Sequence, residues 1–283
     1  IMQHARAALW MIGAIFSFTS MAIAGREIAE NLDTFEIMLY RSIIGFVIVI
    51  VVAYAADTMK EVNFQLFSIH IIRNVFHFTG QNLWFFALQL IPLAQLFALE
   101  FTSPIWVMLL APILLGEKLT LRKFFLVALG FIGVLIVARP EIGALNTGIL
   151  AGAAAAIGFA GAAILTRKLT HTDSLTKILF FLTGLQLLFG LICAGYDGDI
   201  ALPNSSSLPW VIVIGTAGLM AHLCLTKSLS MAPASVVMPI DFARLPLIAI
   251  LAVIFYDEAL DIFVILGASL ILLSNYVSLR RQS

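Results

Sequence analysis

Residues 88–101 read LQLIPLAQLFALEF, and residues 229–242 read LSMAPASVVMPIDF, 141 positions further along the chain. Both stretches carry a proline at the fifth position and end in an acid followed by phenylalanine, with Glu100 in the first and Asp241 in the second. Inserting an ionisable side chain into the middle of a membrane helix costs about 2.5–3.5 kcal/mol. An acid in so apolar a stretch is therefore a candidate for function, and here two acids occupy equivalent positions.

The match extends beyond these two stretches. At the same offset Glu117 falls on Glu258, and each lies at the predicted end of an apolar helix. A single match is weak evidence, because apolar helices resemble one another by composition. The shared offset of all these features nevertheless predicts a duplication, with a first repeat over residues 1–141 and a second over residues 142–283.

The composition is that of a membrane protein. Of the 283 residues, 61% are hydrophobic and 11% are charged, with a mean hydropathy of +1.06, whereas soluble domains average about 45–50% apolar and 25% charged residues. Sixteen basic residues balance sixteen acidic ones, so we expect no binding of nucleic acid. Cys193 and Cys224 lie in apolar context without a partner motif, which favours buried thiols over a redox or metal site.

Ten stretches are long and apolar enough to form helices that cross a hydrocarbon core about 30 Å thick. They cover residues 7–24, 35–55, 67–90, 93–115, 122–138, 147–166, 176–195, 209–229, 234–256 and 261–279. The connections are short, so any chemistry must lie within or between the helices. Because backbone polar groups in lipid must be satisfied internally, we predict an all-α integral membrane protein with ten transmembrane helices.

Lysine and arginine are unevenly distributed over the two sides of such a bundle. Arg41 and Arg244 are set aside as intramembrane. With the N-terminus in the cytoplasm, twelve basic residues fall on the inner side and only Arg26 and Arg139 on the outer side. Since cytoplasmic connections carry the excess of basic residues, we expect a multi-pass protein of the cell inner membrane with both termini in the cytoplasm.

Five helices per repeat is an odd number, so the second repeat must cross the membrane in the opposite direction to the first. Inverted repeats are typical of secondary transporters, whose substrate site lies near the midplane between the halves. Each acid follows the proline that begins its helix by eight residues, from opposite faces of the membrane. At 1.5 Å per residue both acids lie about 12 Å deep, so Glu100 and Asp241 are expected to approach one central level.

Other polar residues are expected at the same level. The third predicted helix contains RNVFHFTGQNLWFFAL, which places Arg73, His77, Gln81 and Trp84 along one helical face. At the offset of 141, Gln81 falls on His222 in the eighth predicted helix. The polar positions are therefore paired between the halves, as the acids are.

Arg244 follows Asp241 by one helical turn and is expected to reach Asp241 or Glu100. Aromatic rings beside an acid suit a cationic or ring-bearing ligand, and prolines beside the acids free carbonyls that can line a cavity. The substrate-binding residues expected from the sequence are Glu100, Asp241, Arg244, His77, Gln81, Trp84, His222, Trp106 and Tyr40.

Structural roles compete with these functional ones. Asp241 and Arg244 are also read as a buried structural ion pair, and His77 and His222 as satisfied core histidines. Glu100 stands apart because no cation lies near it in the sequence.

Four further charged residues are read as structural. Arg41 and Arg73 lie within two turns of predicted helix ends and are expected to extend their charges toward the membrane surface. Glu117 and Glu258 are expected to serve at the ends of their helices.

Several of these motifs together resemble one known family. The stretch EFTSP at residues 100–104, and LGEKLT at 115–120 leading into ALGFIGVLIV, are similar to the EamA branch of the drug/metabolite transporter superfamily. The resemblance covers nearly the whole chain and is weaker in the second half, where YDE at 256–258 replaces LGE. It implies a secondary transporter of small metabolites that works by alternating access, but it does not name the cargo.

We therefore expect a secondary active transporter of a small polar or zwitterionic, amino-acid-like metabolite, with carriers of organic cations or organic anions as alternatives. Two carboxylates at one level suit proton exchange, so proton or ion coupling is left open, and no cofactor or metal is expected. Catalytic motifs such as HExxH or GxSxG are absent, which argues against an enzyme. A channel or membrane scaffold is the remote alternative, and a monomer or homodimer in the lipid bilayer is expected.

Overall fold

The computed structural model describes residues 2–28, 31–115, 121–138, 146–196, 198–231, 240–241, 243–259 and 261–279. Every regular element in these ranges is helical, which confirms the all-α prediction for the described part of the chain. The elements are α1 (Met2–Ile28), α2 (Thr34–Ala55), the short 3₁₀ helix η1 (Met59–Glu61), α3 (Phe67–Leu90), α4 (Leu93–Glu100), α5 (Ser103–Leu115), α6 (Leu121–Ala138), α7 (Thr147–Leu169), α8 (Leu175–Ala194), α9 (Leu208–Met231), α11 (Arg244–Tyr256) and α12 (Ile262–Leu279).

Polar residues at the connections define where several helices begin. Asp33 and Glu36 form a capping box at α2, in which each side chain accepts a hydrogen bond from the backbone of the other residue. Asn146 accepts hydrogen bonds at the start of α7, and Ser174 accepts one from the backbone of Lys177 at the start of α8. These caps satisfy backbone donors that have no partner inside the helix.

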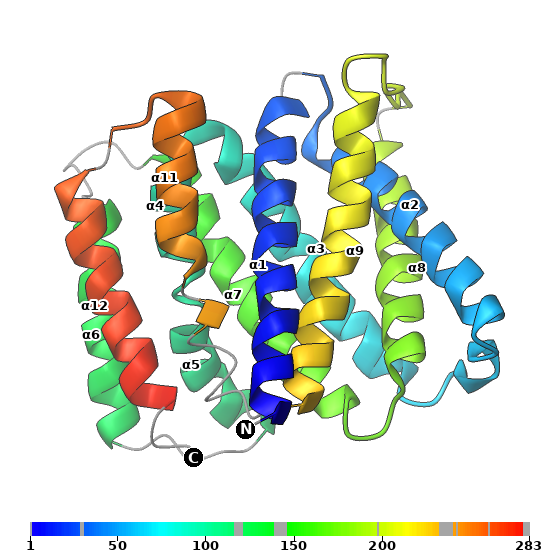
Figure 1. The fold of residues 1–283 in the computed structure, drawn as a ribbon, viewed down its shortest axis with the longest axis horizontal. Coiled ribbons are helices and arrows are strands. Elements are labelled where there is room, and N and C mark those ends of the chain that lie inside the picture. Colours follow the sequence, from blue (N-terminus) through cyan, green and yellow to red (C-terminus); the bar gives the residue numbers. More distant parts are fainter. Residues whose placement is uncertain are drawn as a thin grey trace.

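The helices stand side by side in one bundle, with α6 and α12 at one end and α2 and α8 at the other (Figure 1). The most extensive contacts join α1 to α9, α3 to α7, α2 to α8, and α6 to α12. Each of these pairs combines a helix from before residue 141 with one from after it. The two parts of the chain are therefore packed into each other.

The crossing of α3 on α7 is a close one, and it depends on two glycines. A Cβ atom placed on Gly158 would lie 2.7 Å from the Cα atom of Gly80. A side chain at this position would therefore push the two backbones apart. The small-residue run at residues 148–165 permits this approach.

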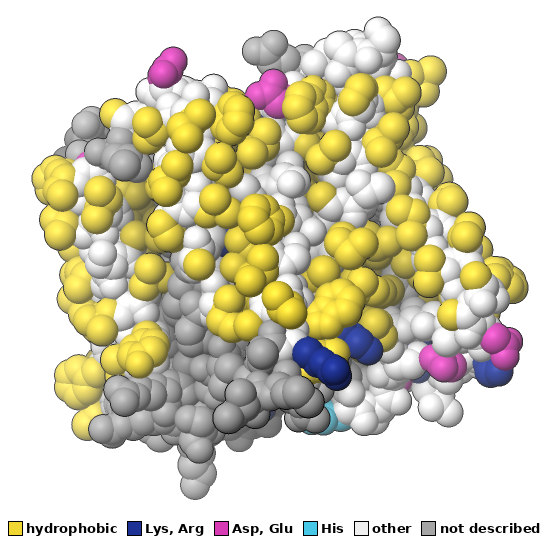
Figure 2. Space-filling view, in the orientation of Figure 1, with side chains coloured by type: hydrophobic (Ala, Val, Ile, Leu, Met, Phe, Trp, Pro, Cys, Tyr) yellow, Lys and Arg dark blue, Asp and Glu magenta, His cyan; other side chains and the backbone are white. Residues whose placement is uncertain are grey.

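Among the described residues, six segments are long and apolar enough to cross a membrane, and three shorter apolar helices accompany them. The six are Arg6–Ile28, Thr34–Ala55, Leu93–Leu110, Thr147–Leu169, Leu175–Ala194 and Leu208–Ser228. On the face drawn in Figure 2, hydrophobic side chains cover the middle and charged ones lie toward the upper and lower edges. This distribution fits a bundle surrounded by lipid, because charges are tolerated at the membrane surfaces and not in between.

In the described part of the chain, six of the ten predicted spans overlap segments that are long and apolar enough to cross a membrane, and two predicted spans differ from the observed helices in their course. The span predicted at 93–115 consists of two helices, because the chain leaves regular helical geometry after Glu100 and resumes it at Ser103. The span predicted at 234–256 is described only from Ile240 onward, and residues 232–239 lie outside the described part.

Candidate functional site

The break between α4 and α5 contains the sequence EFTSP and places Glu100 at the last position of α4. The side-chain hydroxyl of Thr102 donates to the carbonyl of Leu99 (2.6 Å), and that of Ser103 donates to the carbonyl of Glu100 (2.7 Å). Pro104 stands in the first turn of α5, where a missing backbone N–H costs no helical hydrogen bond. The backbone N–H of Thr102 also donates to the carbonyl of Leu99 (3.0 Å), so the hydroxyl groups add to the hydrogen bonds at the break.

Glu100, Arg244 and Asp241 form a charge cluster in the protein interior. A terminal guanidinium nitrogen of Arg244, Nη2, donates to Glu100 (2.8 Å) and to Asp241 (3.1 Å). The indole Nε1 of Trp84 donates to the other carboxylate oxygen of Glu100 (2.8 Å). The side chains of Glu100, Asp241 and Arg244 are only 14%, 9% and 6% exposed. We call Glu100, Asp241, Arg244 and Trp84 the acidic cluster. All four belong to the predicted set, and they come from three different parts of the chain.

Aromatic rings enclose the cation of the acidic cluster. The guanidinium carbon of Arg244 lies 4.8 Å from the ring centre of Phe18, 5.3 Å from that of Phe97 and 5.1 Å from that of Phe101. Such cation–π contacts contribute about 0.5–2 kcal/mol each, more when water is excluded. Two atoms of the cluster, Asp241 Oδ1 and Arg244 Nε, are buried without a hydrogen-bond partner.

A pair of histidines lies beside this cluster. The rings of His77 on α3 and His222 on α9 meet edge to face with their centres 5.0 Å apart, and the Nε2 atom of each is buried without a hydrogen-bond partner. Phe18 connects the two groups, because its ring lies 5.8 Å from that of His222 as well as against Arg244. Gln81, one turn beyond His77, is 3% exposed.

Two predicted site residues make contacts elsewhere. The hydroxyl of Tyr40 donates to the backbone carbonyl of Ala201 (2.7 Å), in the connection after α8. Trp106 is packed edge to face on Phe131, with ring centres 5.1 Å apart. The structure brings neither side chain to the acidic cluster, and in both cases ordinary packing or capping contacts account for the ring.

The two helix-end glutamates differ in what the structure describes. Glu258 forms an ion pair with Arg26 at the end of α1 and accepts a hydrogen bond from the backbone N–H of Leu93 (2.8 Å) at the start of α4. It thereby joins three segments that are distant in the sequence. Glu117 lies outside the described residues.

Two arginines differ from the expectation that they reach toward the membrane surface. Arg41 and Arg73 are 7% and 4% exposed and lie inside the bundle. Arg73 Nε donates to Thr166 Oγ1 (2.9 Å) across the α3–α7 contact. The expectation was wrong because these helices are covered by α7, α8 and α9, so their polar faces point inward.

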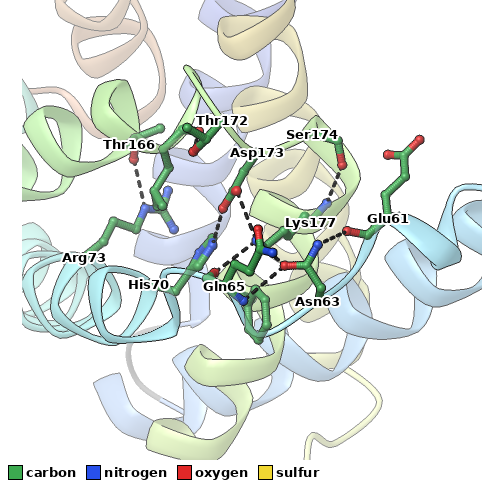
Figure 3. A network of polar contacts seen from close by, with 12 residues as sticks. Glu61, Asn63, Gln65, His70, Arg73, Thr166, Thr172, Asp173, Ser174 and Lys177 are labelled. Atoms are coloured by element: carbon green, nitrogen blue, oxygen red, sulfur yellow. Dashed lines mark hydrogen bonds and ion pairs between the residues drawn. The ribbon is translucent and has the colours of Figure 1, made fainter.

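A second polar network joins the beginnings of α3 and α8 (Figure 3). The ammonium of Lys177, 2% exposed, donates to Asn63 Oδ1 (2.8 Å), the carbonyl of Gln65 (3.0 Å) and Asp173 Oδ1 (3.0 Å), and His70 Nε2 lies 2.8 Å from Asp173 Oδ2. Burial raises the pKa of the Asp173 carboxyl, but its hydrogen bonds with Lys177 and His70 outweigh burial and leave that pKa below its ordinary value. The sequence pattern does not reveal this network, because its residues resemble those of ordinary polar connections.

The chain is similar to known transporters. The profile described as "EamA-like transporter family" matches it twice, at residues 5–139 and 146–280. An S-adenosylmethionine uptake transporter of Rickettsia conorii is 25% identical over 265 residues, which is 93% of this chain and 88% of the relative. A riboflavin transporter of Vibrio cholerae is 28% identical over 273 residues, 94% of this chain and 90% of the relative.

Similarity also extends to solved structures. One crystal structure superimposes with a TM-score of 0.67 at 20% sequence identity, covering 99% of both chains. At that identity the likeness concerns the fold alone.

Proposed function

The chain belongs to the EamA-like transporter family, within the drug/metabolite transporter superfamily, and from this premise we propose that it is a secondary active transporter of a small polar or zwitterionic metabolite. Its family and its named relatives are transporters of small metabolites, not enzymes. The observation that carries the proposal is the acidic cluster, a charged group held inside an apolar membrane bundle.

The proposed architecture is ten transmembrane helices in two inverted five-helix repeats, divided as residues 1–141 and 142–283. Two matches of one family profile support a duplication. The packing supports its symmetry: α1 packs on α9 as α7 packs on α3, while α2 with α8 and α6 with α12 pair equivalent helices. A two-fold axis lying in the membrane plane would generate this pattern.

In the proposed mechanism the substrate competes with Arg244 for the two carboxylates. Glu100 and Asp241 now share one guanidinium, so a cationic group of the substrate, or a proton, can replace it. Trp84 already holds one oxygen of Glu100 in place. Alternating access would then move this exchange from one side of the membrane to the other, with His77, Gln81 and His222 orienting the substrate. We place the protein in the inner membrane with both termini in the cytoplasm.

The relatives supply the first substrates to test. One is named for S-adenosylmethionine and another for riboflavin; both compounds carry ring systems, and only the first carries a positive charge and an amino-acid group. The acidic cluster with its aromatic walls favours the first class. The same rings, Phe18, Phe97 and Phe101, also favour a carrier of simple organic cations as the second candidate.

The test is saturable counterflow in proteoliposomes that contain the purified protein. S-adenosylmethionine, riboflavin, amino acids, amines and organic acids are loaded inside in turn, and uptake of the labelled compound is measured. Accelerated uptake of one compound by its own unlabelled form identifies the cargo and distinguishes a carrier from a channel. If no compound shows counterflow, and flux rises linearly with concentration instead, the carrier proposal fails.

A further inference from the structure

Arg41 is a buried cation for which the described residues supply no counter-charge. Its side chain lies on α2, seven residues from the first residue of the helix, and the residue is 7% exposed. Its guanidinium nitrogen Nη1 donates a hydrogen bond to the sulfur of Met38, at 3.8 Å. In the described part of the chain, the neighbouring cation Arg73 forms hydrogen bonds with the neutral groups of Thr166 and Asn74 and with no carboxylate. A buried charge without a partner is strongly destabilising, so its retention needs a cause.

A small cavity adjoins Arg41. It has a volume of about 20 Å³, enough for a group the size of a water molecule. Its polar lining is formed by Arg41 and Ser42 on α2, Thr183 and Gln186 on α8, and His222 on α9. The bundle thus contains a small polar cavity that is lined in part by the guanidinium of Arg41.

Two atoms of the lining residues have no hydrogen-bond partner: Gln186 Oε1 and His222 Nε2. Gln186 is 2% exposed, and its amide nitrogen is fixed by donating to the carbonyl and the side-chain oxygen of Asn74, both at 3.0 Å. The hydroxyl groups of Ser42 and Thr183 donate to backbone carbonyls of their own helices. Arg41 and His222 therefore remain as the donors available to a ligand.

A glycine makes room for the guanidinium. A Cβ atom on Gly218 would lie 2.6 Å from Arg41 Nε. Any other residue at this position on α9 would displace the guanidinium, so its present place depends on Gly218.

We propose that this cavity is an anion-binding subsite, which takes the carboxylate of the transported metabolite while the acidic cluster takes its cationic group. A planar guanidinium binds a carboxylate through two parallel hydrogen bonds, His222 donates a third, and Gln186 accepts from a donor of the ligand. Phe18 lies against both His222 and Arg244, so one ring separates the two subsites. The identity of the ligand as a metabolite rests on the proposed function, whereas the anion site itself does not.

Formate is the probe, because it is the smallest carboxylate and one of its oxygens matches the water-sized cavity. Melting temperature is measured on the full chain in detergent, with formate replacing gluconate, a larger anion, at constant ionic strength. Formate is expected to raise the melting temperature of the wild type by at least about 2 °C and to leave Arg41→Gln unchanged. No rise in the wild type, or an equal rise in the variant, overturns the site.

If Arg41→Gln does not fold, a second variant tests the anion site. Gly218→Ala keeps the charge and moves the guanidinium, so it should at least halve the shift caused by formate. A full shift in Gly218→Ala would contradict the geometry proposed for the subsite.

The counterflow assay distinguishes the source of the carboxylate. Formate on both sides of the membrane is expected to reduce uptake of the transported compound several-fold if the subsite takes that compound's own carboxylate. Unchanged uptake means that the subsite holds a free anion and overturns the assignment to the metabolite. A formate shift in melting temperature without counterflow of any compound retains the anion site and rejects the transport proposal.

Discussion

Arg244 and Arg41 are buried to similar degrees, at 5% and 7% exposure, yet their surroundings are opposite. Arg244 is shared by two carboxylates and enclosed by three aromatic rings, while Arg41 faces a cavity and no described carboxylate pairs with it. A membrane bundle can thus hold a guanidinium in two ways: it neutralises the charge internally, or it leaves the charge for a ligand. Arg244 therefore stabilises the protein without ligand, whereas Arg41 destabilises it until an anion binds.

The largest effect is expected from removing the neutralised cation. Arg244→Gln leaves Glu100 and Asp241 buried together without a positive charge, so the free energy of unfolding should fall by about 3–5 kcal/mol. Denaturant titration in detergent measures it. The matched control is Arg41→Gln, for which stability in gluconate should stay the same or rise, because a buried charge without a counter-charge is removed. Equal losses in both variants would contradict the comparison.

The network around Lys177 contains a further buried ion pair to test, between Lys177 and Asp173. Asp173→Asn removes the carboxylate beside a buried ammonium and should lower the free energy of unfolding by about 3 kcal/mol. Because the pKa of Asp173 is below its ordinary value of 3.8 in the folded protein, its stabilisation is complete above that value and is lost as the pH falls through the lower folded value. Melting temperatures compared between the two proteins should therefore differ at pH 6 and converge only as the pH falls below 3.8 and through the lower folded pKa. A constant difference would argue against this linkage.

Glu100→Gln should affect transport more than folding. The amide oxygen can still accept from Trp84, and Arg244 keeps Asp241, so the expected loss of stability is about 1–2 kcal/mol. If Glu100 exchanges a proton during transport, the variant loses the pH dependence of uptake. Counterflow measured between pH 5.5 and 8 checks this, and a profile like that of the wild type would assign the coupling elsewhere.

The smallest effect is expected at the ring between the two subsites. Phe18→Leu removes the cation–π contact with Arg244 and should cost about 1 kcal/mol beyond the loss of apolar volume. The same substitution in the Arg244→Gln background isolates the contact in a double-mutant cycle. A coupling energy near zero would show that Phe18 only fills space.

Much of the helical framework was predictable from the sequence, for reasons that particular segments show. The span predicted at residues 35–55 nearly coincides with α2, because long apolar stretches bounded by polar connections have few alternatives in lipid. Glu100, Asp241 and Arg244 were found because a charge in such a stretch is conspicuous, and because the offset of 141 paired the two acids.

The remaining features depend on tertiary contacts that no local pattern encodes. Phe18 is one of 22 phenylalanines, and only the packing of α1 against α9 and α11 shows that it lies between Arg244 and His222. The position of Arg41 near a helix end could be predicted from the sequence, and it suggested a side chain that extends to the membrane surface. The covering of α2 by α8 and α9 could not be predicted. Pro104 indicated an irregularity near Glu100. The sequence does not distinguish a proline in the first turn of a new helix from a proline inside one longer helix, so the break itself was not predicted.

The pairing of early helices with late ones has a consequence for how the protein is made. At a synthesis rate of about 5–20 residues per second, α9 follows α1 by roughly 10–40 s, and α12 arrives later still. Until α8 and α9 are made, α1 and α2 are in the bilayer without their main partners, so Arg41 on α2 faces lipid or a helper protein. The nascent first half is thus the form most exposed to quality-control proteases, and a substitution harmless to the finished bundle can still reduce the amount of protein that a cell accumulates.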